Sequence, residues 1–216
     1  MRLCLKLSKH TTLIKRYIKM ENTTTIPVMI YTESTPNPNT LKFVTNKALL
    51  LNDAVEFQNI EETNEAPLAK ELFGFDGVTN VFISNNFVTV TKTDDFIWPE
   101  IMIPIKDFLK KYIDDGNTIL TENYVKPTKT ATNTINENDS DVEIRIKGAL
   151  DKYVKPAVEM DGGNISFVKF EEGKLTLQLQ GSCSGCPSST VTLKQGIENL
   201  LKRFVPEVQE VVAENE

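Results

Sequence analysis

The sequence predicts two small α+β domains joined by a flexible linker, and three observations lead to this prediction. Its 216 residues, 40% of them hydrophobic and 25% charged, are enough for two small globular domains. Strand patterns and helical patterns are mixed within each half of the chain, as in α+β folds. Between the halves, residues 118–140 are rich in Thr, Asn, Lys and Glu and show no regular apolar period, which is typical of a linker.

The first domain is expected at residues 27–117. Strand patterns occur in VMIYTES, LKFVT, VEFQN and VTNVFISNNFVTVTKT, the last divided by a turn at Asn85 and Asn86. PLAKELFGF predicts a short helix with Pro67 at its first position. IWPEIMIPIKDFLKKYIDDG carries a helical apolar stripe, in which Pro104 implies a kink or a late start.

The second domain is expected at residues 141–213, with the element order αββαβ. A helix begins at DVEIRIK with Asp141 as a candidate cap, is disturbed by Pro156 and stops at the DGG sequence. NISFVKFEEGKLTLQLQG predicts a hairpin that turns at Glu172 and Gly173. PSSTVTLKQGIENLLKRF then predicts a helix, and VQEVVAE a last short strand.

Residues 1–26 are expected to be a disordered extension. Residues 1–19 contain six basic side chains and no acid, which is typical of a mitochondrial presequence, although Met20 is also a candidate start. We expect Met20 to be the start and the protein to be bacterial and cytoplasmic, with the mitochondrial matrix as the alternative. The net charge of -6 and the lack of an apolar run of about 20 residues argue against nucleic acid and membrane as partners.

The sequence GSCSGCPSS contains Cys183 and Cys186, two of the three cysteines in the chain. The third, Cys4, and the single histidine, His10, lie in the extension. A closed zinc site needs about four Cys or His ligands, so two thiols cannot complete one. Because a strand precedes the pair and a helix follows from Pro187, we expect an exposed loop with both thiolates pointing the same way. At the helix N-cap, backbone N–H groups and the helix dipole should lower the pKa of Cys186.

Three interpretations of the pair remain open from these residues alone. The spacing could be incidental, or it could be a thioredoxin-like redox pair, although the single Trp, Trp98, lies far from it in the other half. In the third interpretation two chains each contribute two thiolates, which together supply the four sulfurs of an iron–sulfur cluster.

The residues around the pair resemble a known family. MDGGNISFVKFEEGKLTLQLQGSCSGCPSSTVTLKQGIENLL resembles the C-terminal domain of NifU, found in the NifU-like (Nfu) iron–sulfur scaffold and carrier proteins. TESTPNPNTLKFV and GVTNVFISNNFVTVTK resemble the N-terminal domain of many Nfu proteins.

This resemblance implies a carrier and not an enzyme, with no catalytic residue. Cys183 and Cys186 would be the metal ligands, holding a transient iron–sulfur cluster, expected to be [4Fe–4S], between two subunits. The implied partners are a second copy of the chain on cluster binding, upstream cluster assembly proteins, and the apo iron–sulfur client proteins that receive the cluster. A thiol–disulfide oxidoreductase remains the alternative function.

Overall fold

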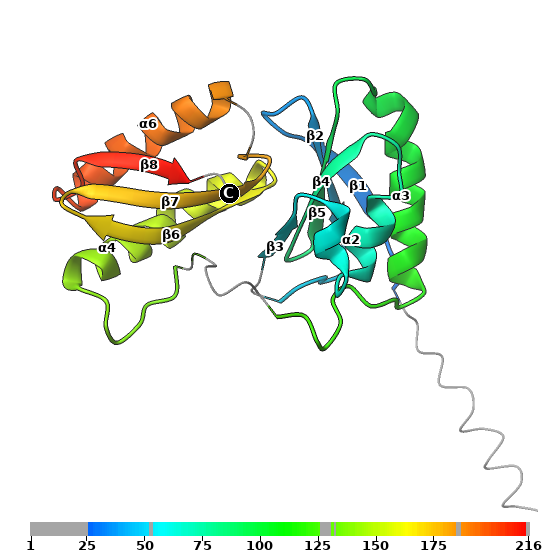
Figure 1. Ribbon diagram of the computed structural model, residues 1–216, viewed down its shortest axis with the longest axis horizontal. Helices are drawn as coiled ribbons and strands as arrows, with labels where there is room; N and C mark the ends of the chain where they lie inside the picture. Colours follow the sequence, from blue (N-terminus) through cyan, green and yellow to red (C-terminus); the bar gives the residue numbers. More distant parts are fainter. Residues whose placement is uncertain (1–25, 52–53, 126–130, 132, 185–186, 215–216) are drawn as a thin grey trace, which may run out of the picture.

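The computed structural model describes residues 26–51, 54–125, 131, 133–184 and 187–214, apart from the side chains of 187–192. It confirms the α+β class, with two domains that lie side by side (Figure 1). Each domain has its own sheet, one of five strands and one of three. Within the described ranges, no helix is both long and apolar enough to cross a lipid bilayer.

The first domain is an antiparallel sheet with the strand order β1-β2-β5-β4-β3. Helix α3 runs without interruption through Pro104, so the late start that this proline suggested is wrong. At the predicted hairpin turn Asn85 takes the left-handed conformation, with a φ of 40°. The elements are β1 (Ile30–Ser34), β2 (Thr40–Thr45), β3 (Ala54–Phe57), η1 (Ile60–Thr63), α2 (Pro67–Leu72), β4 (Val78–Ser84), β5 (Phe87–Lys92) and α3 (Trp98–Asp114).

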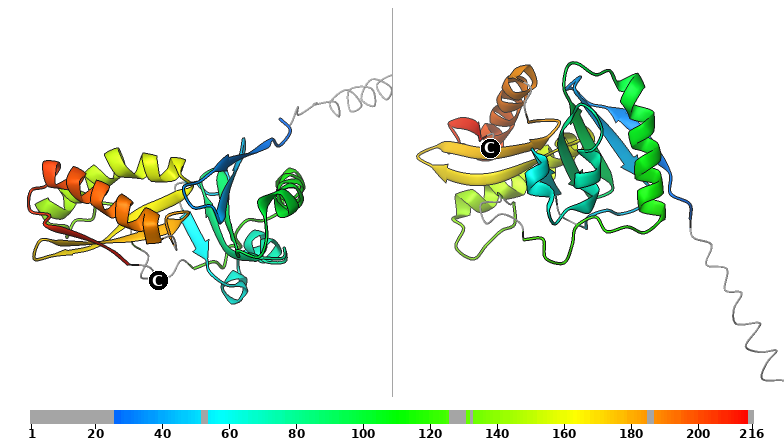
Figure 2. Two further views of the ribbon diagram at one scale, coloured as in Figure 1. Left: turned by 90° about the horizontal axis from the view of Figure 1, so that it is seen from above. Right: turned by 45° about the vertical axis from the view of Figure 1, so that its right-hand side comes forward.

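The two faces of this sheet have different roles. One face packs under α2 and α3 and forms the main core, with Phe43, Leu68 and Ile105 buried in it. Because side chains alternate along a strand, Phe82 and Phe87 point to the opposite face, where they form a small separate apolar cluster. Figure 1 and Figure 2 show the second domain lying against this opposite face.

The second domain confirms the predicted order αββαβ, if α4, η2 and α5 are taken as one interrupted helix. Strand β7 pairs antiparallel with β6 and parallel with β8, which α6 connects to it. The helices cover one face of the sheet (Figure 2). The elements are α4 (Asp141–Ala149), η2 (Leu150–Val154), α5 (Lys155–Met160), β6 (Gly163–Glu171), β7 (Lys174–Gly181), α6 (Pro187–Phe204) and β8 (Glu210–Glu214).

Two details of the first helix differ from the sequence prediction. Ser140, and not Asp141, is the N-cap, because its side chain and that of Glu143 form a reciprocal capping box. Where Pro156 was predicted to disturb the helix, the structure has a π-helical turn, η2, which ends two residues before the proline. A wider turn removes the clash between the proline ring and the carbonyl one turn earlier.

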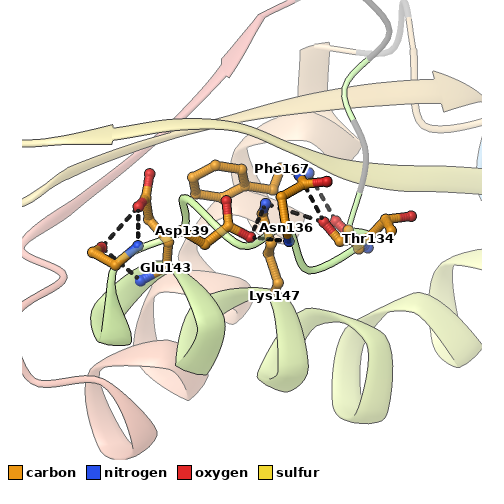
Figure 3. Close-up of polar contacts among 8 residues, drawn as sticks. Thr134, Asn136, Asp139, Glu143, Lys147 and Phe167 are labelled. Atoms are coloured by element: carbon orange, nitrogen blue, oxygen red, sulfur yellow. Dashed lines mark hydrogen bonds and ion pairs between the residues drawn. The ribbon is translucent and has the colours of Figure 1, made fainter.

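Much of segment 118–140 packs against the domains, although its composition suggested a flexible connection. Tyr124 packs edge-on against Phe57 of the first domain. On the other side, Lys147 Nζ lies 2.6 Å from Asp139 Oδ2 and 3.1 Å from Thr134 O, and 5.0 Å from the centre of the Phe167 ring (Figure 3). These contacts fix residues 133–139 to the second domain.

Asn133 is the most buried residue of this stretch, with 9% exposure. Its side-chain amide donates to Ile165 O at 3.1 Å and to Asp151 Oδ1 at 2.8 Å, while its oxygen accepts from Phe167 N at 2.8 Å. The side chain thus pairs with the free edge of β6, as a neighbouring strand would.

Asn133→Ala should destabilise the second domain by about 1–3 kcal/mol, because it leaves a buried N–H and a buried C=O without a partner. Chemical denaturation followed by circular dichroism measures this loss. Asn138→Ala is the matched control, since Asn138 is exposed in the same segment. Equal stability of the two variants would contradict the role given to Asn133.

Candidate functional site

The loop that carries Cys183 lies where backbone segments crowd together at one end of the second domain. Gly162 and Gly163 join α5 to β6, and Gly181 ends β7 beside them. A Cβ at Gly163 would lie 2.8 Å from Cys183 Sγ, and a Cβ at Gly181 would lie 2.6 Å from Gly162 O. Gly162 and Gly181 also have φ values of 82° and 67°. The DGG sequence, expected to be a helix stop, is therefore also part of the wall around the cysteine.

Hydrogen bonds hold this loop against the end of α5. Ser182 N donates to Gly162 O at 3.2 Å, and the Ser182 hydroxyl donates to Asp161 O. Ser184 N donates to Gly181 O at 3.1 Å and closes the turn between them. The cysteine between the two serines is thereby held in a defined position.

The Cys183 side chain is buried, so the expectation of an exposed thiolate is wrong for this residue. It is 7% exposed and packs with the apolar core of the second domain. Burial raises the pKa of its thiol to about 11; the Ser182 hydroxyl opposes this shift, and the charges of Asp161 and Glu56 add to it. At neutral pH the sulfur is therefore a protonated thiol. Cys186, whose pKa was expected to be lowered, lies outside the described residues.

A carboxyl group of the first domain contacts the loop directly. Glu56 Oε1, from the edge strand β3, accepts from Gly181 N at 2.9 Å and from Asn80 Nδ2 at 3.0 Å. It also lies 3.1 Å from the hydroxyl of Ser184, which is 2.8 Å from Gly181 O and donates to one oxygen at a time. Burial raises the pKa of Glu56, while these hydrogen bonds oppose the shift.

Further contacts join the same two surfaces. Thr89 Oγ1 donates to Gly162 O at 2.7 Å, and Lys42 Nζ donates to Met160 O at 3.2 Å. The Phe82 ring packs so closely on the end of β7 that a Cβ at Gly181 would lie 2.9 Å from it. The sheet face opposite α2 and α3 therefore covers the end of the second domain next to the cysteine loop.

The described residues contain no group of three or more Cys, His, Asp or Glu side chains arranged to hold a metal ion. Cys186 stays a candidate ligand from the sequence alone.

The sequence reasoning missed Glu56, Thr89 and Lys42 as neighbours of the cysteine loop. Glu56 looks like an ordinary solvated acid in a short edge strand, and Thr89 and Lys42 look like the polar positions of alternating strands. No motif marks them. The one available signal was the glycines on both sides of the cysteine, because glycine permits the close backbone approach seen here.

Two family models match the chain. The model described as "Scaffold protein Nfu/NifU N terminal" matches residues 30–116, and the model described as "NifU-like domain" matches residues 146–212. These matches confirm that the first half of the sequence resembles the Nfu N-terminal domain and the second half the NifU C-terminal domain.

Curated relatives match both domains together. NifU-like protein 4, mitochondrial, from Arabidopsis thaliana is 40% identical over 193 residues, which are 87% of this chain and 66% of that protein. NFU1 iron-sulfur cluster scaffold homolog, mitochondrial, from Homo sapiens is 39% identical over 189 residues, 85% of this chain and 71% of that protein. The chain thus spans about two thirds of the length of these relatives.

Among solved structures, the solution structure of a NifU-like protein from Saccharomyces cerevisiae matches at 28% identity. It covers 44% of this chain and 87% of that one, with a TM-score of 0.40.

The raised pKa of Cys183 predicts an unusual pH dependence of its alkylation. In a Cys186→Ser protein, the rate at which iodoacetamide alkylates Cys183 should still rise with a slope of about tenfold per pH unit between pH 9 and 9.5. With a thiol pKa of about 11, the thiolate fraction is still growing in proportion to the hydroxide concentration in this range. A short unstructured peptide with blocked ends and one Cys, whose thiol pKa is near the usual ~8.5, should level off in that range. Peptide mass spectrometry gives both rates, and a plateau for Cys183 below about pH 9 would contradict its burial.

Proposed function

The chain belongs to the NifU-like (Nfu) iron–sulfur cluster scaffold family, and on this premise we propose that it carries a transient iron–sulfur cluster through Cys183 and Cys186 and passes it to apo-proteins. The observation that carries the proposal is the CxxC sequence at the β7–α6 junction of the NifU-like domain. The cluster is cargo in this function, and the chain needs no catalytic residue to hold it.

Two thiols per chain fit a cluster that is shared between two copies. Iron–sulfur clusters of the [4Fe–4S] and [2Fe–2S] types are commonly held by four thiolates. Two chains supply that number from Cys183 and Cys186 alone. Cluster loading should therefore convert monomers into dimers, and the bound cluster should be [4Fe–4S].

The oxidoreductase alternative receives less support. A thiol that attacks a disulfide needs an appreciable thiolate fraction at neutral pH. The buried Cys183, with a thiol pKa of about 11, has the opposite property in this structure. Cys186 is the other candidate nucleophile, so an insulin reductase assay remains the direct comparison.

We also propose a mitochondrial location in place of the bacterial cytoplasm. Relatives from Arabidopsis thaliana and Homo sapiens carry the word mitochondrial in their names, which supports the matrix alternative and not the bacterial cytoplasm that was first expected. The six basic and no acidic residues in positions 1–19 suit a presequence.

Anaerobic reconstitution with iron and sulfide should give a brown dimer with about four irons per two chains. Cys183→Ser and Cys186→Ser should each abolish stable binding and dimer formation, because each removes two of the four thiolates from the dimer. Iron analysis and a sizing column measure both effects. Cys4→Ser is the control and should load fully; full loading of the Cys183→Ser protein would contradict the proposal.

Subcellular fractionation tests the proposed location. The native protein should be recovered in mitochondria with a shortened N-terminus, because a presequence is removed after import. Mass spectrometry of the purified protein identifies the first residue. A protein that begins at Met1 or Met20 and is found in the cytosol would contradict mitochondrial import.

A further inference from the structure

The contact between the two domains holds the cysteine loop from outside. Glu56 Oε1 is bonded to Gly181 N and lies within hydrogen-bonding distance of the Ser184 hydroxyl, so one carboxyl group of β3 spans both sides of Cys183. Thr89 bonds Gly162 O at 2.7 Å, on the backbone segment that accepts from Ser182 N. The first domain therefore fixes both the loop and the segment beneath it.

In this closed arrangement Cys183 is not presented to a cluster shared with another subunit. A bound iron must come within about 2.3 Å of the cysteine sulfur, as metals bound by thiolates do. Cys183 is 7% exposed and packs in the hydrophobic core of its own domain, so its sulfur must move outward to meet an iron. Glu56 contacts the loop on both sides of Cys183 and so opposes this outward movement while the first domain stays in place.

The two domains can separate without unfolding. Each has its own hydrophobic core, one under α2 and α3 and the other between α4, α6 and the second sheet. The surface between them is partly polar. Asn80 Oδ1, which is buried beside Glu56, accepts no hydrogen bond from the described residues. A polar contact with an unsatisfied acceptor is weaker than a domain core.

We propose that the first domain is a clasp on the cysteine loop. Glu56 and Thr89 hold a closed form in which Cys183 is withheld, and the domains must part before the loop can take up a cluster. The statement about clusters rests on the proposed function, whereas the statement about the closed form does not.

The direct test measures how fast Cys183 is alkylated in the full-length, metal-free protein. All proteins carry Cys186→Ser, so that the loop has one thiol, and peptide mass spectrometry follows iodoacetamide labelling at one pH. The double variant Glu56→Ala with Thr89→Val should label Cys183 at least about tenfold faster, because it removes several hydrogen bonds across the contact, which together are worth on the order of a tenfold factor or more. Thr89→Val alone should give a smaller increase in the same direction.

Matched controls make the same changes away from the contact. Glu100→Ala removes an exposed carboxylate at the start of α3, and Thr32→Val replaces a threonine of β1 whose hydroxyl faces Met102 of α3. Both should label at the rate of the unchanged protein. Circular dichroism and thermal unfolding show whether each variant is folded, and Thr89→Val, which keeps the side-chain shape, provides a test if Glu56→Ala does not fold.

The outcomes separate the clasp from the proposed function. Folded clasp variants that label Cys183 no faster than the controls would overturn the clasp. Faster labelling of the Thr89→Val protein, which loses no charge near the thiol, supports it, whether or not a cluster binds. In proteins that keep Cys186, faster reconstitution with iron and sulfide in the double variant is also expected. Failure of both the unchanged protein and the variant to bind a cluster would overturn the proposed function alone.

Discussion

The close approach of backbone at Gly162, Gly163 and Gly181 is the constraint on which the site depends. It lets the end of α5, the start of β6 and the end of β7 meet with no side chain between them, so that Cys183 Sγ fills the remaining space. The same crowding leaves Gly162 O and Gly181 N accessible to the first domain, which bonds both. One packing requirement thus explains both the burial of the cysteine and the position of the domain contact.

Burial and cluster binding make opposite demands on the sulfur. A protonated, buried thiol is protected from oxidation and alkylation because the thiolate is the reactive species. A cluster ligand must be a thiolate that iron can reach. A single rigid arrangement of the loop cannot satisfy both demands, whereas two arrangements of the domains can. In the clasp proposal, the contact of the first domain with the cysteine loop provides the second arrangement.

Local patterns in the sequence were sufficient to predict the elements of the fold, but they could not predict the contacts between residues far apart in the chain. The hairpin at Glu172 and Gly173 could be predicted because Gly173 suits a left-handed turn between two alternating strand patterns, and in the structure both residues have positive φ. The π-helical turn before Pro156 could not, because the proline predicts a disturbance without its form. The residues of the first domain that contact the Cys183 loop could not be predicted either, for a different reason. Glu56 is 127 residues before Cys183, and no periodicity links a carboxyl group to a loop in another domain.

The clasp has a consequence for how tightly a cluster is held. If only the open form binds, the apparent affinity for the cluster equals the intrinsic affinity multiplied by the fraction of open protein. A contact made of a few hydrogen bonds and a small apolar cluster around Phe82 keeps that fraction low while the loop is free. When the domains close again, the contact competes with the cluster for the loop. A carrier must release its cargo, and such competition weakens the hold on the cluster without changing the thiolates that bind it.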